Sequence, residues 1–357
     1  MVSTPASTGP QVHWQAARLA SQSGDRVAER AALALILADN RRDIAALLAT
    51  GESFVRDGDD RAAVSWFTTA INQAGVTPPP ANLHPLLDRA VRYCNEAQGR
   101  FSAAMNAALA GADIGTAGSP ALRHAVDLLH GRADLYLQQP TMFYYPGLPQ
   151  RAFYEREEFP WVEAIESQAE ALRNEYLALI NTDQPFAPYV QRSAARPPSS
   201  SPLLDDPSWG AAYLWQGGET TALAERCPAT MAALALAPLP HIAGRSPMAL
   251  YSRLTPGTHI APHHGLLNTR LICHLPLVVP DGCGLRVGAE TREWRFGEML
   301  IFDDSFEHEA WNRGSEDRTI LLFETWRPEI PESDRALLAR LFTAIDAADP
   351  ARGQEQA

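Results

Sequence analysis

The histidines of this chain, which are its best candidates for metal binding, are concentrated in one stretch. Five of the ten histidines fall between His259 and His308 in a chain of 357 residues. Short runs of β-type residues, separated by Gly, Pro and Asp, surround them. Neutral imidazoles carried on a β scaffold are typical ligands of a divalent transition metal. The stretch therefore predicts a metal site.

Two of these histidines and one arginine have a spacing typical of iron oxygenases. His263 and His308 lie 45 positions apart, each beside a turn, and Arg318 follows ten positions later at the start of a strand. Two imidazoles can hold Fe(II) and leave positions open for a substrate and O2. A planar guanidinium can bind a carboxylate through two parallel hydrogen bonds. This order is that of non-haem oxygenases that use 2-oxoglutarate, although these usually have a carboxylate where this chain has Gly265.

Short β-strands are expected to position these side chains. From residue 248 onward the apolar period changes to two, and Leu250, Ser252 and Leu254 share one face. The same alternation over 269–279 places Arg270 and His274 on one face, together with Ile272. Many short strands separated by turns favour a β-sandwich or barrel. Further strands are expected at 285–287, 293–296, 299–302, 309–311 and 319–326.

The N-terminal third is rich in alanine and predicts helices that nearly repeat. A Gly-Asp pair at 24–25 recurs at 58–59, a period of 34 residues, and each pair precedes an apolar helical run. The spacing Gly-x2-aromatic followed by Ala-x3-Phe is typical of tetratricopeptide repeats. A third unit is expected after the proline-rich break at 77–80, with a Gly-Arg pair at 99–100 before another apolar run. An ordinary helical bundle fits the same pattern, and neither alternative supplies chemistry. The repeat pattern is carried by Gly51, Phe54, Ala63, Phe67 and Ala70.

Three further helices and one long loop complete the expected elements. Helices are expected at 161–180 and 221–236, and a last one with Ser333 as its N-cap. The segment 191–206 is the most loop-like stretch, and it is either a lid or a plain connection.

The composition argues against several classes of partner. The chain has 42 acidic and 30 basic residues, a formal net charge of -12, which disfavours nucleic acid or an anionic membrane as the main partner. Its four cysteines form no CxxC pair, which fits a reducing compartment. Neither a secretory leader nor a long uncharged apolar run is visible. We expect a soluble, cytoplasmic protein without a membrane segment.

Five motifs are distinctive: FYYPGLP, FPW, PGTHIAPHHGLLNTRL, LIFDDSFEHEAWN and RTILLFETWRPEI. Together they resemble the aspartyl/asparaginyl β-hydroxylase family over about residues 143–330. The resemblance implies a double-stranded β-helix (a jelly-roll or cupin-like fold) with flanking helices, preceded in some members by tetratricopeptide-like helices, so the expected fold class is α+β. Members of this family have glycine in place of the missing carboxylate, which agrees with Gly265.

The resemblance also implies roles for individual residues. His263 and His308 would be the Fe(II) ligands and, with Arg318, the catalytic residues. Arg318 would also bind 2-oxoglutarate, and Ser252, Arg270 and His274 match other positions of the cosubstrate pocket. Animal members read Arg-x-Arg-x-His before the pocket histidine, whereas this chain has Ile272 at the second arginine. Outside this set, we expect His259 and His264 to be structural, and Asp303 and Asp304 to form an acidic turn that binds backbone amides.

The expected activity is that of an Fe(II)- and 2-oxoglutarate-dependent dioxygenase that uses O2 to hydroxylate an unactivated C–H bond. The first candidate is the β-carbon of Asp or Asn in a peptide or protein. One alternative is a small-molecule or natural-product substrate, and another is a tetratricopeptide protein-interaction module with an inactive oxygenase-like domain. A zinc hydrolase would need a third protein ligand, which the spacing does not offer.

The expected domain organisation has four parts. A flexible N-terminus covers 1–12, and a tetratricopeptide-like helical domain, which could bind a separate protein partner, covers 13–138. The oxygenase domain covers 139–332, and a C-terminal helix and tail cover 333–357.

Overall fold

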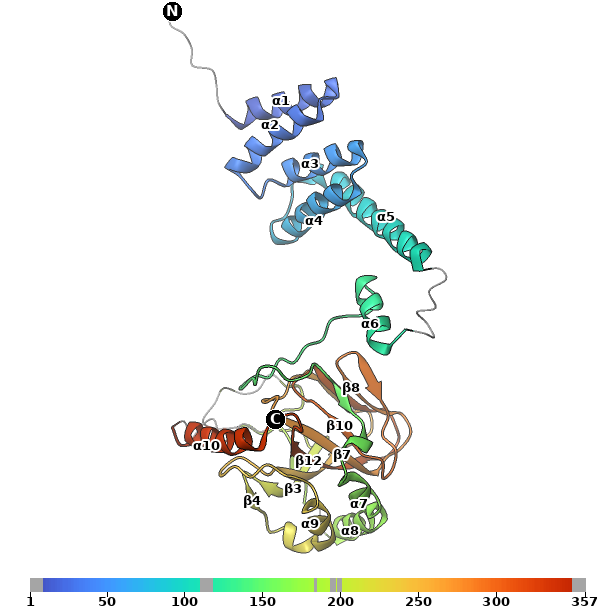
Figure 1. Cartoon of the computed structure of the whole chain (residues 1–357), viewed down its shortest axis with the longest axis vertical. Helices are drawn as coiled ribbons and strands as arrows, with labels where there is room; N and C mark the ends of the chain where they lie inside the picture. The colour runs from blue at the N-terminus through green and yellow to red at the C-terminus, as the bar shows by residue number, and fades with distance from the viewer. Residues whose placement is uncertain (1–8, 110–117, 183–184, 193–196, 198–200, 349–357) are drawn as a thin grey trace, which may run out of the picture. The chain divides into compact units, whose positions relative to one another are not determined.

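The computed structural model describes residues 9–109, 118–182, 185–192, 197 and 201–348. The chain divides into two compact units, Met1–Arg132 and Ala133–Ala357, which Figure 1 shows as a helical unit and a unit of strands with helices. The helical unit contains α1 (Pro10–Ser23), α2 (Arg26–Asp39), α3 (Ile44–Asp57), α4 (Asp60–Val76), the 3-10 turn η1 (Ala81–Leu83), α5 (His84–Leu109) and α6 (Pro120–Leu129).

The recurring Gly-Asp pairs form the turns of two helical hairpins, α1 with α2 and α3 with α4. Gly24 and Gly58 end the first helix of each hairpin with φ of 79° and 74°, a left-handed conformation in which glycine has no Cβ to clash. The side chains of Asp25 and Asp59 then cap the second helix, because each accepts a backbone N–H from three residues further on. The helices are therefore consistent with repeats.

Close packing inside the second hairpin depends on a glycine. A Cβ on Gly51 would lie 2.5 Å from Cε1 of Phe67, so only glycine lets α3 approach this ring. Phe67 is buried between Ala63 and Ala70, one turn away on either side. The Gly-Arg pair at 99–100 of the expected third unit forms no hairpin turn, because α5 runs through Gly99 without interruption.

The second unit is built on two antiparallel sheets. The eight-stranded sheet has the order β1-β10-β7-β12-β5-β3-β2, with β4 paired to β3, and the four-stranded sheet has the order β6-β11-β8-β9. Side chains of both sheets share one core, so the sheets face each other. The fold is α+β with a double-stranded β-helix, as expected. The strands are β1 (Phe153–Tyr154), β2 (Ala187–Pro188), β3 (Trp209–Gln216), β4 (Glu219–Thr220), β5 (Ala249–Leu254), β6 (His259–His263), β7 (Arg270–Val278), β8 (Cys283–Val287), β9 (Glu290–Arg292), β10 (Leu300–Phe302), β11 (His308–Asn312) and β12 (Arg318–Trp326).

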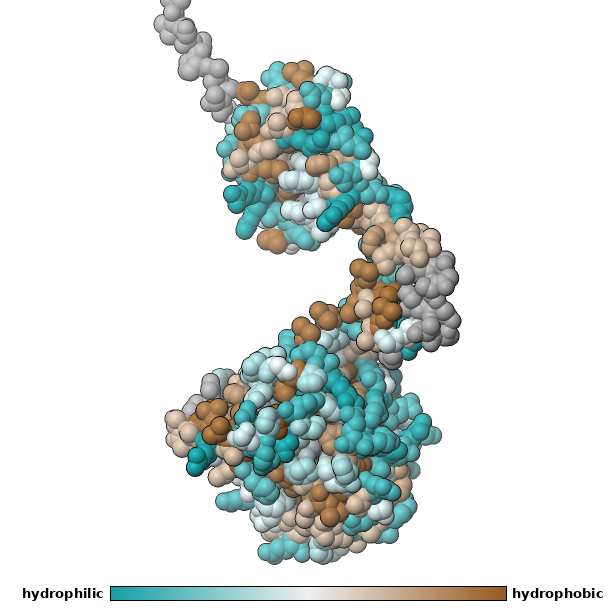
Figure 2. All heavy atoms as spheres, in the orientation of Figure 1, coloured by the Kyte–Doolittle hydropathy of each residue, from teal (hydrophilic) through white to brown (hydrophobic). Residues whose placement is uncertain are grey.

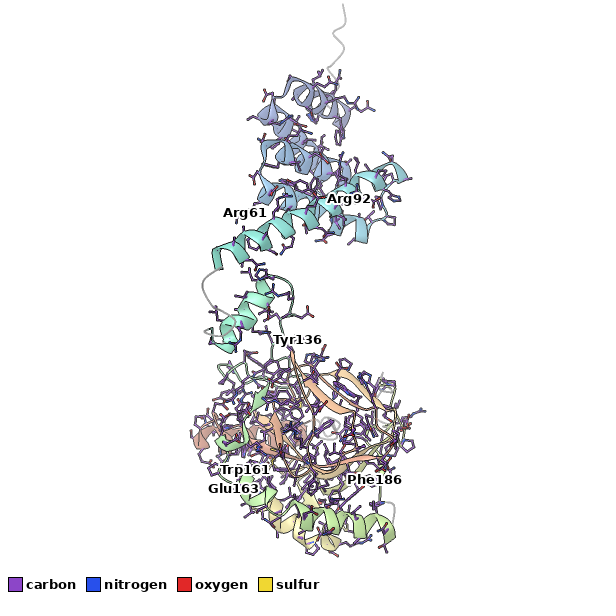
Figure 3. The ribbon with its side chains drawn as sticks, turned by 90° about the vertical axis from the view of Figure 1, so that its right-hand side faces the viewer. Arg61, Arg92, Tyr136, Trp161, Glu163 and Phe186 are labelled. Atoms are coloured by element: carbon purple, nitrogen blue, oxygen red, sulfur yellow. The ribbon has the colours of Figure 1, made fainter. Side chains whose placement is uncertain are left out.

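Alternation along the strands directs side chains into two different cores. On β7, Leu271 and Cys273 join a core beneath helices α7 (Val162–Glu166), α8 (Ala169–Thr182) and α9 (Pro228–Leu234), whereas Ile272 joins the core between the sheets. Figure 1 shows these three helices gathered on one side of β7 and β12, and Figure 3 labels Trp161 and Glu163 at the start of α7. Hydrophilic residues predominate on the face of this unit seen in Figure 2.

Several expected elements differ from those observed. The helix expected at 161–180 is broken at 167–168, and 221–236 holds the 3-10 turn η3 (Ala224–Arg226) followed by α9, because Pro228 has no N–H to continue the turn. Ser333 is not an N-cap, since α10 (Glu332–Ala348) begins one residue earlier. Residues 293–296 form no strand and contribute one isolated bridge at Arg295. Much of the loop expected at 191–206 lies outside the described residues. No helix in the described part of the chain is long and apolar enough to span a bilayer.

Candidate active site

The pairing of β6 with β11 places two histidines opposite each other. His263 is in register with His308, and their ring centroids are 4.1 Å apart. Nδ1 of His263 lies 2.8 Å from the carbonyl oxygen of Ala261, and Nδ1 of His308 lies 3.0 Å from that of Phe306. A carbonyl only accepts, so Nδ1 carries the proton in each ring and Nε2 keeps its lone pair. The strand pair thus presents two imidazole donors side by side.

The surroundings of these rings keep them neutral. Burial lowers the pKa of His263 below its usual value. Burial first, and the neighbouring His263 second, lower the pKa of His308 to about 3. A metal competes with protons for the ring nitrogens, so neutral imidazoles are ready to bind one.

Arg318 forms the basic end of the same pocket. It opens β12, is 1% exposed, and its guanidinium carbon lies 4.7 Å from the centre of the Trp294 ring. Its Nε and Nη1 are buried without a hydrogen-bond partner in the described structure. Burial lowers its pKa to about 10, which leaves the group charged at neutral pH. A buried cation without a counterion is costly, so the site favours an anionic ligand.

Two strands of the large sheet bring further polar side chains to this pocket. Ser252 on β5 pairs with Ile320, and His274 on β7 pairs with Leu322, so both face the pocket from strands that flank β12. Burial first, then Arg318 and His308, lower the pKa of His274 well below its usual value, so this ring is neutral. The pocket has a volume of about 550 Å³, which includes its open mouth. Five predicted residues meet there, namely Ser252, His263, His274, His308 and Arg318.

Arg270, the remaining predicted residue, is placed differently. Its Nη1 lies 2.5 Å from Oε2 of Glu324 and its Nη2 lies 3.4 Å from Oδ2 of Asp304. Its side chain does not line the pocket, and its charge is matched by these two carboxylates.

The two aspartates after β10 have different surroundings. Asp303 accepts hydrogen bonds from the backbone N–H and the hydroxyl of Ser305 and pairs with Arg327, in agreement with an acidic turn. Asp304 instead lines the pocket, and its Oδ1 is buried without a partner in the described structure. A Cβ on Gly265 would overlap the Asp304 carboxylate, so glycine at this position makes room for it. Burial raises the pKa of Asp304, against the opposing effects of Arg270 and His263.

Sequence reasoning treated these two aspartates alike and therefore missed Asp304. The available signal was strand parity, because neighbouring residues at the end of a strand point in opposite directions.

The other two of the five histidines between residues 259 and 308 lie outside the pocket. His259 is exposed and its Nε2 lies 2.7 Å from Oε2 of Glu309, and His264 is not among the lining residues. Across the described residues, no group of three or more His, Cys, Asp or Glu side chains is placed to hold a metal ion.

Residues 166–328 match the family model described as aspartyl/asparaginyl beta-hydroxylase. This part of the chain belongs to that family. Human aspartyl/asparaginyl beta-hydroxylase is 40% identical over 146 residues, which are 40% of this chain and 19% of the human protein. An ornithine lipid ester-linked acyl 2-hydroxylase from Rhizobium tropici is 31% identical over 188 residues, which are 52% of this chain and 63% of that protein.

The chain thus spans less than two thirds of either relative, and about a fifth of the human one. Among solved structures, a cupin 2 conserved barrel domain protein from Salinispora arenicola is 12% identical, covers 38% of this chain and 84% of that one, and has a TM-score of 0.23. A structural similarity this low supports no conclusion about the site. The names of the relatives describe hydroxylases, and membership of the β-hydroxylase family indicates an enzyme of that kind.

Proposed function

We propose that the chain is an Fe(II)- and 2-oxoglutarate-dependent hydroxylase. The observation that supports this most is the buried Arg318 guanidinium with unpaired nitrogens, in the same pocket as two neutral imidazoles. His263 and His308 would hold the iron through their Nε2 atoms. When bound, iron with 2-oxoglutarate and O2 would supply the oxidation of an unactivated C–H bond.

The side chains of the pocket would bind and orient the cosubstrate. Arg318 would accept the distal carboxylate of 2-oxoglutarate, which would satisfy the unpaired Nε and Nη1. The Ser252 hydroxyl and the unpartnered Nδ1 of neutral His274 would fix its orientation from the neighbouring strands. Asp304 would place a carboxyl group in the pocket next to Gly265, which has no side chain of its own.

For the substrate, we propose first the β-carbon of an Asp or Asn side chain in a peptide or protein. The name of the human relative supports this, whereas the Rhizobium tropici relative is named for a lipid, which supports a small-molecule substrate instead. The helical unit would then recruit a protein substrate or a separate partner.

The test uses purified protein under anaerobic conditions. We expect 2-oxoglutarate to bind only when Fe(II) is present, and succinate to form slowly after O2 is added, even without prime substrate. His308→Ala should abolish metal binding, whereas His259→Ala should keep it because His259 lies outside the pocket. No iron-dependent 2-oxoglutarate binding together with no succinate would refute the proposal and favour an inactive interaction module.

A further inference from the structure

Positive charge in the pocket can come only from arginine or protonated histidine, because the chain contains no lysine. Three histidines line the pocket: in the proposed function His263 and His308 hold the metal through their Nε2 atoms, and His274 orients the cosubstrate. Among the described lining residues, Arg318 alone is a permanent cation. If Arg318 binds 2-oxoglutarate, as the proposed function requires, no lining cation is left for the prime substrate.

Arg270 cannot take over this task. Its guanidinium faces two carboxylates, those of Glu324 and Asp304, at 2.5 and 3.4 Å. Glu324 is fully buried and also accepts the backbone N–H of Met248 at 3.0 Å, so it is held in this position. Both Nη atoms of Arg270 are thus occupied, so a substrate carboxylate would have to displace one of these side chains to reach them. Its Nε has no partner in the described structure, but Arg270 is not among the residues that line the pocket.

Ile272 occupies a position on β7 where a basic side chain would face the pocket. On β7 it lies between Arg270 and His274 on the same face, and it pairs with Phe302 of β10 and Glu324 of β12. Its side chain lines the pocket, as do the apolar side chains of Met248, Ile260 and Leu322. Asp304, which contacts Arg270 of the same strand face, also lines the pocket, and its Oδ1 has no partner in the described structure.

A substrate carboxylate in these surroundings would lose water without gaining a cation, and it would approach the Asp304 carboxylate. An amide N–H could instead donate to the Oδ1 of Asp304, and an aliphatic group would pack on Ile272 and Met248. We propose that the substrate presents an uncharged group to this site, an amide or an aliphatic chain, and not a carboxylate. Within the proposed function, this narrows an Asp or Asn target to Asn or another neutral side chain.

The experiment compares three blocked tripeptides that differ only in the central residue: Gly-Asn-Gly, Gly-Leu-Gly and Gly-Asp-Gly. The full chain is loaded with Zn(II) in place of Fe(II), and with 2-oxoglutarate, so that binding is measured without turnover. Saturation-transfer NMR or calorimetry gives each affinity. We expect the asparagine or leucine peptide to bind at least about tenfold more tightly than the aspartate peptide, since the aspartate side chain would be buried without a partner.

Two variants at one position sharpen the comparison. Ile272→Arg adds a cation and should reduce or reverse the preference, whereas Ile272→Met keeps a neutral side chain of similar length and should retain it. Wild-type protein that binds the aspartate peptide as tightly as the neutral ones overturns the inference, and so does failure to bind any of the three. Iron-dependent 2-oxoglutarate binding is measured on the same preparations. If 2-oxoglutarate binds in an iron-dependent way but the aspartate peptide is preferred, only this inference fails. If 2-oxoglutarate does not bind in this way, the proposed function fails.

Discussion

Arg318 carries a charge that the folded protein itself does not satisfy. Burying a cation without a counterion costs stability, while a ligand carboxylate would recover this cost. We expect Arg318→Met to weaken 2-oxoglutarate binding by about 10- to 100-fold, the value of a charged hydrogen-bond pair, and to leave metal binding intact. The same variant should unfold at a higher temperature than wild type when no ligand is present. A structural role for Arg318 would give the opposite stability result.

Arg313→Met is a matched control for this experiment. Arg313 is exposed and stacks on Trp311, so its removal takes away a cation without touching the pocket. Both 2-oxoglutarate affinity and thermal stability should stay close to wild type.

The neutral histidines make stability depend on pH. The pKa of His308 is about 3 in the folded protein and 6.5 when unperturbed, so below pH 6.5 the unfolded chain binds a proton that the folded one does not. The free energy of unfolding is therefore unaffected by this histidine above pH 6.5. As the pH falls from 6.5 toward 3, each such histidine lowers the free energy of unfolding by about 1.4 kcal/mol per pH unit. Urea denaturation of metal-free protein between pH 7 and 4.5 measures this. His308→Gln should reduce the slope, and a variant with the same slope as wild type would contradict this account of His308.

Residue spacing and the family resemblance predicted five residues that line the pocket, but they did not predict which charged side chains would pair with each other. Strand alternation predicted the faces of Ser252 and His274, whereas His263 and His308 were singled out by their spacing and by the family resemblance, and all four line the pocket. The pairing of Arg270 with Glu324 could not be read from the chain, because it joins two strands 54 residues apart in sequence. Without this contact, Arg270 was indistinguishable from a cosubstrate ligand.

At the level of elements, a single glycine sets the distance between α3 and α4. Gly51→Ala should destabilise the helical unit by about 1–3 kcal/mol, because the added methyl group must displace the Phe67 ring. Helix propensity alone predicts that Gly51→Ala would stabilise the helical unit. Gly99→Ala tests this, since nothing lies within 4 Å of its Cβ position, and it should stabilise α5 by about 0.5–1 kcal/mol. Far-UV circular dichroism during chemical denaturation reports both. Equal effects of the two changes would refute this packing argument.

Elements with strong periodicity were predictable, and those decided by pairing or by one proline were not. The alternation at Leu250, Ser252 and Leu254 predicted β5 correctly, and the two Gly-Asp pairs correctly preceded the helices α2 and α4. Strand β3 was missed because its run of buried residues has no alternation to detect, and β1 and β2 have only two residues each. Such strands form because they pair with a neighbouring strand of the sheet, and this tertiary contact cannot be read from their own residues.

At the scale of the whole molecule, every residue of the proposed site comes from the second unit, Ala133–Ala357. The two units have separate cores, so the chemistry does not need the helices for its geometry. A fragment starting at Ala133 should therefore bind Fe(II) and 2-oxoglutarate with affinities within about threefold of the full chain, since differences this small are below 1 kcal/mol. Calorimetry on both proteins measures this. If the helices recruit a protein substrate, the fragment should lose activity on that protein and keep the slow succinate formation that needs no prime substrate. Loss of 2-oxoglutarate binding in a fragment that still shows a cooperative thermal transition would mean that the helical unit helps to build the site.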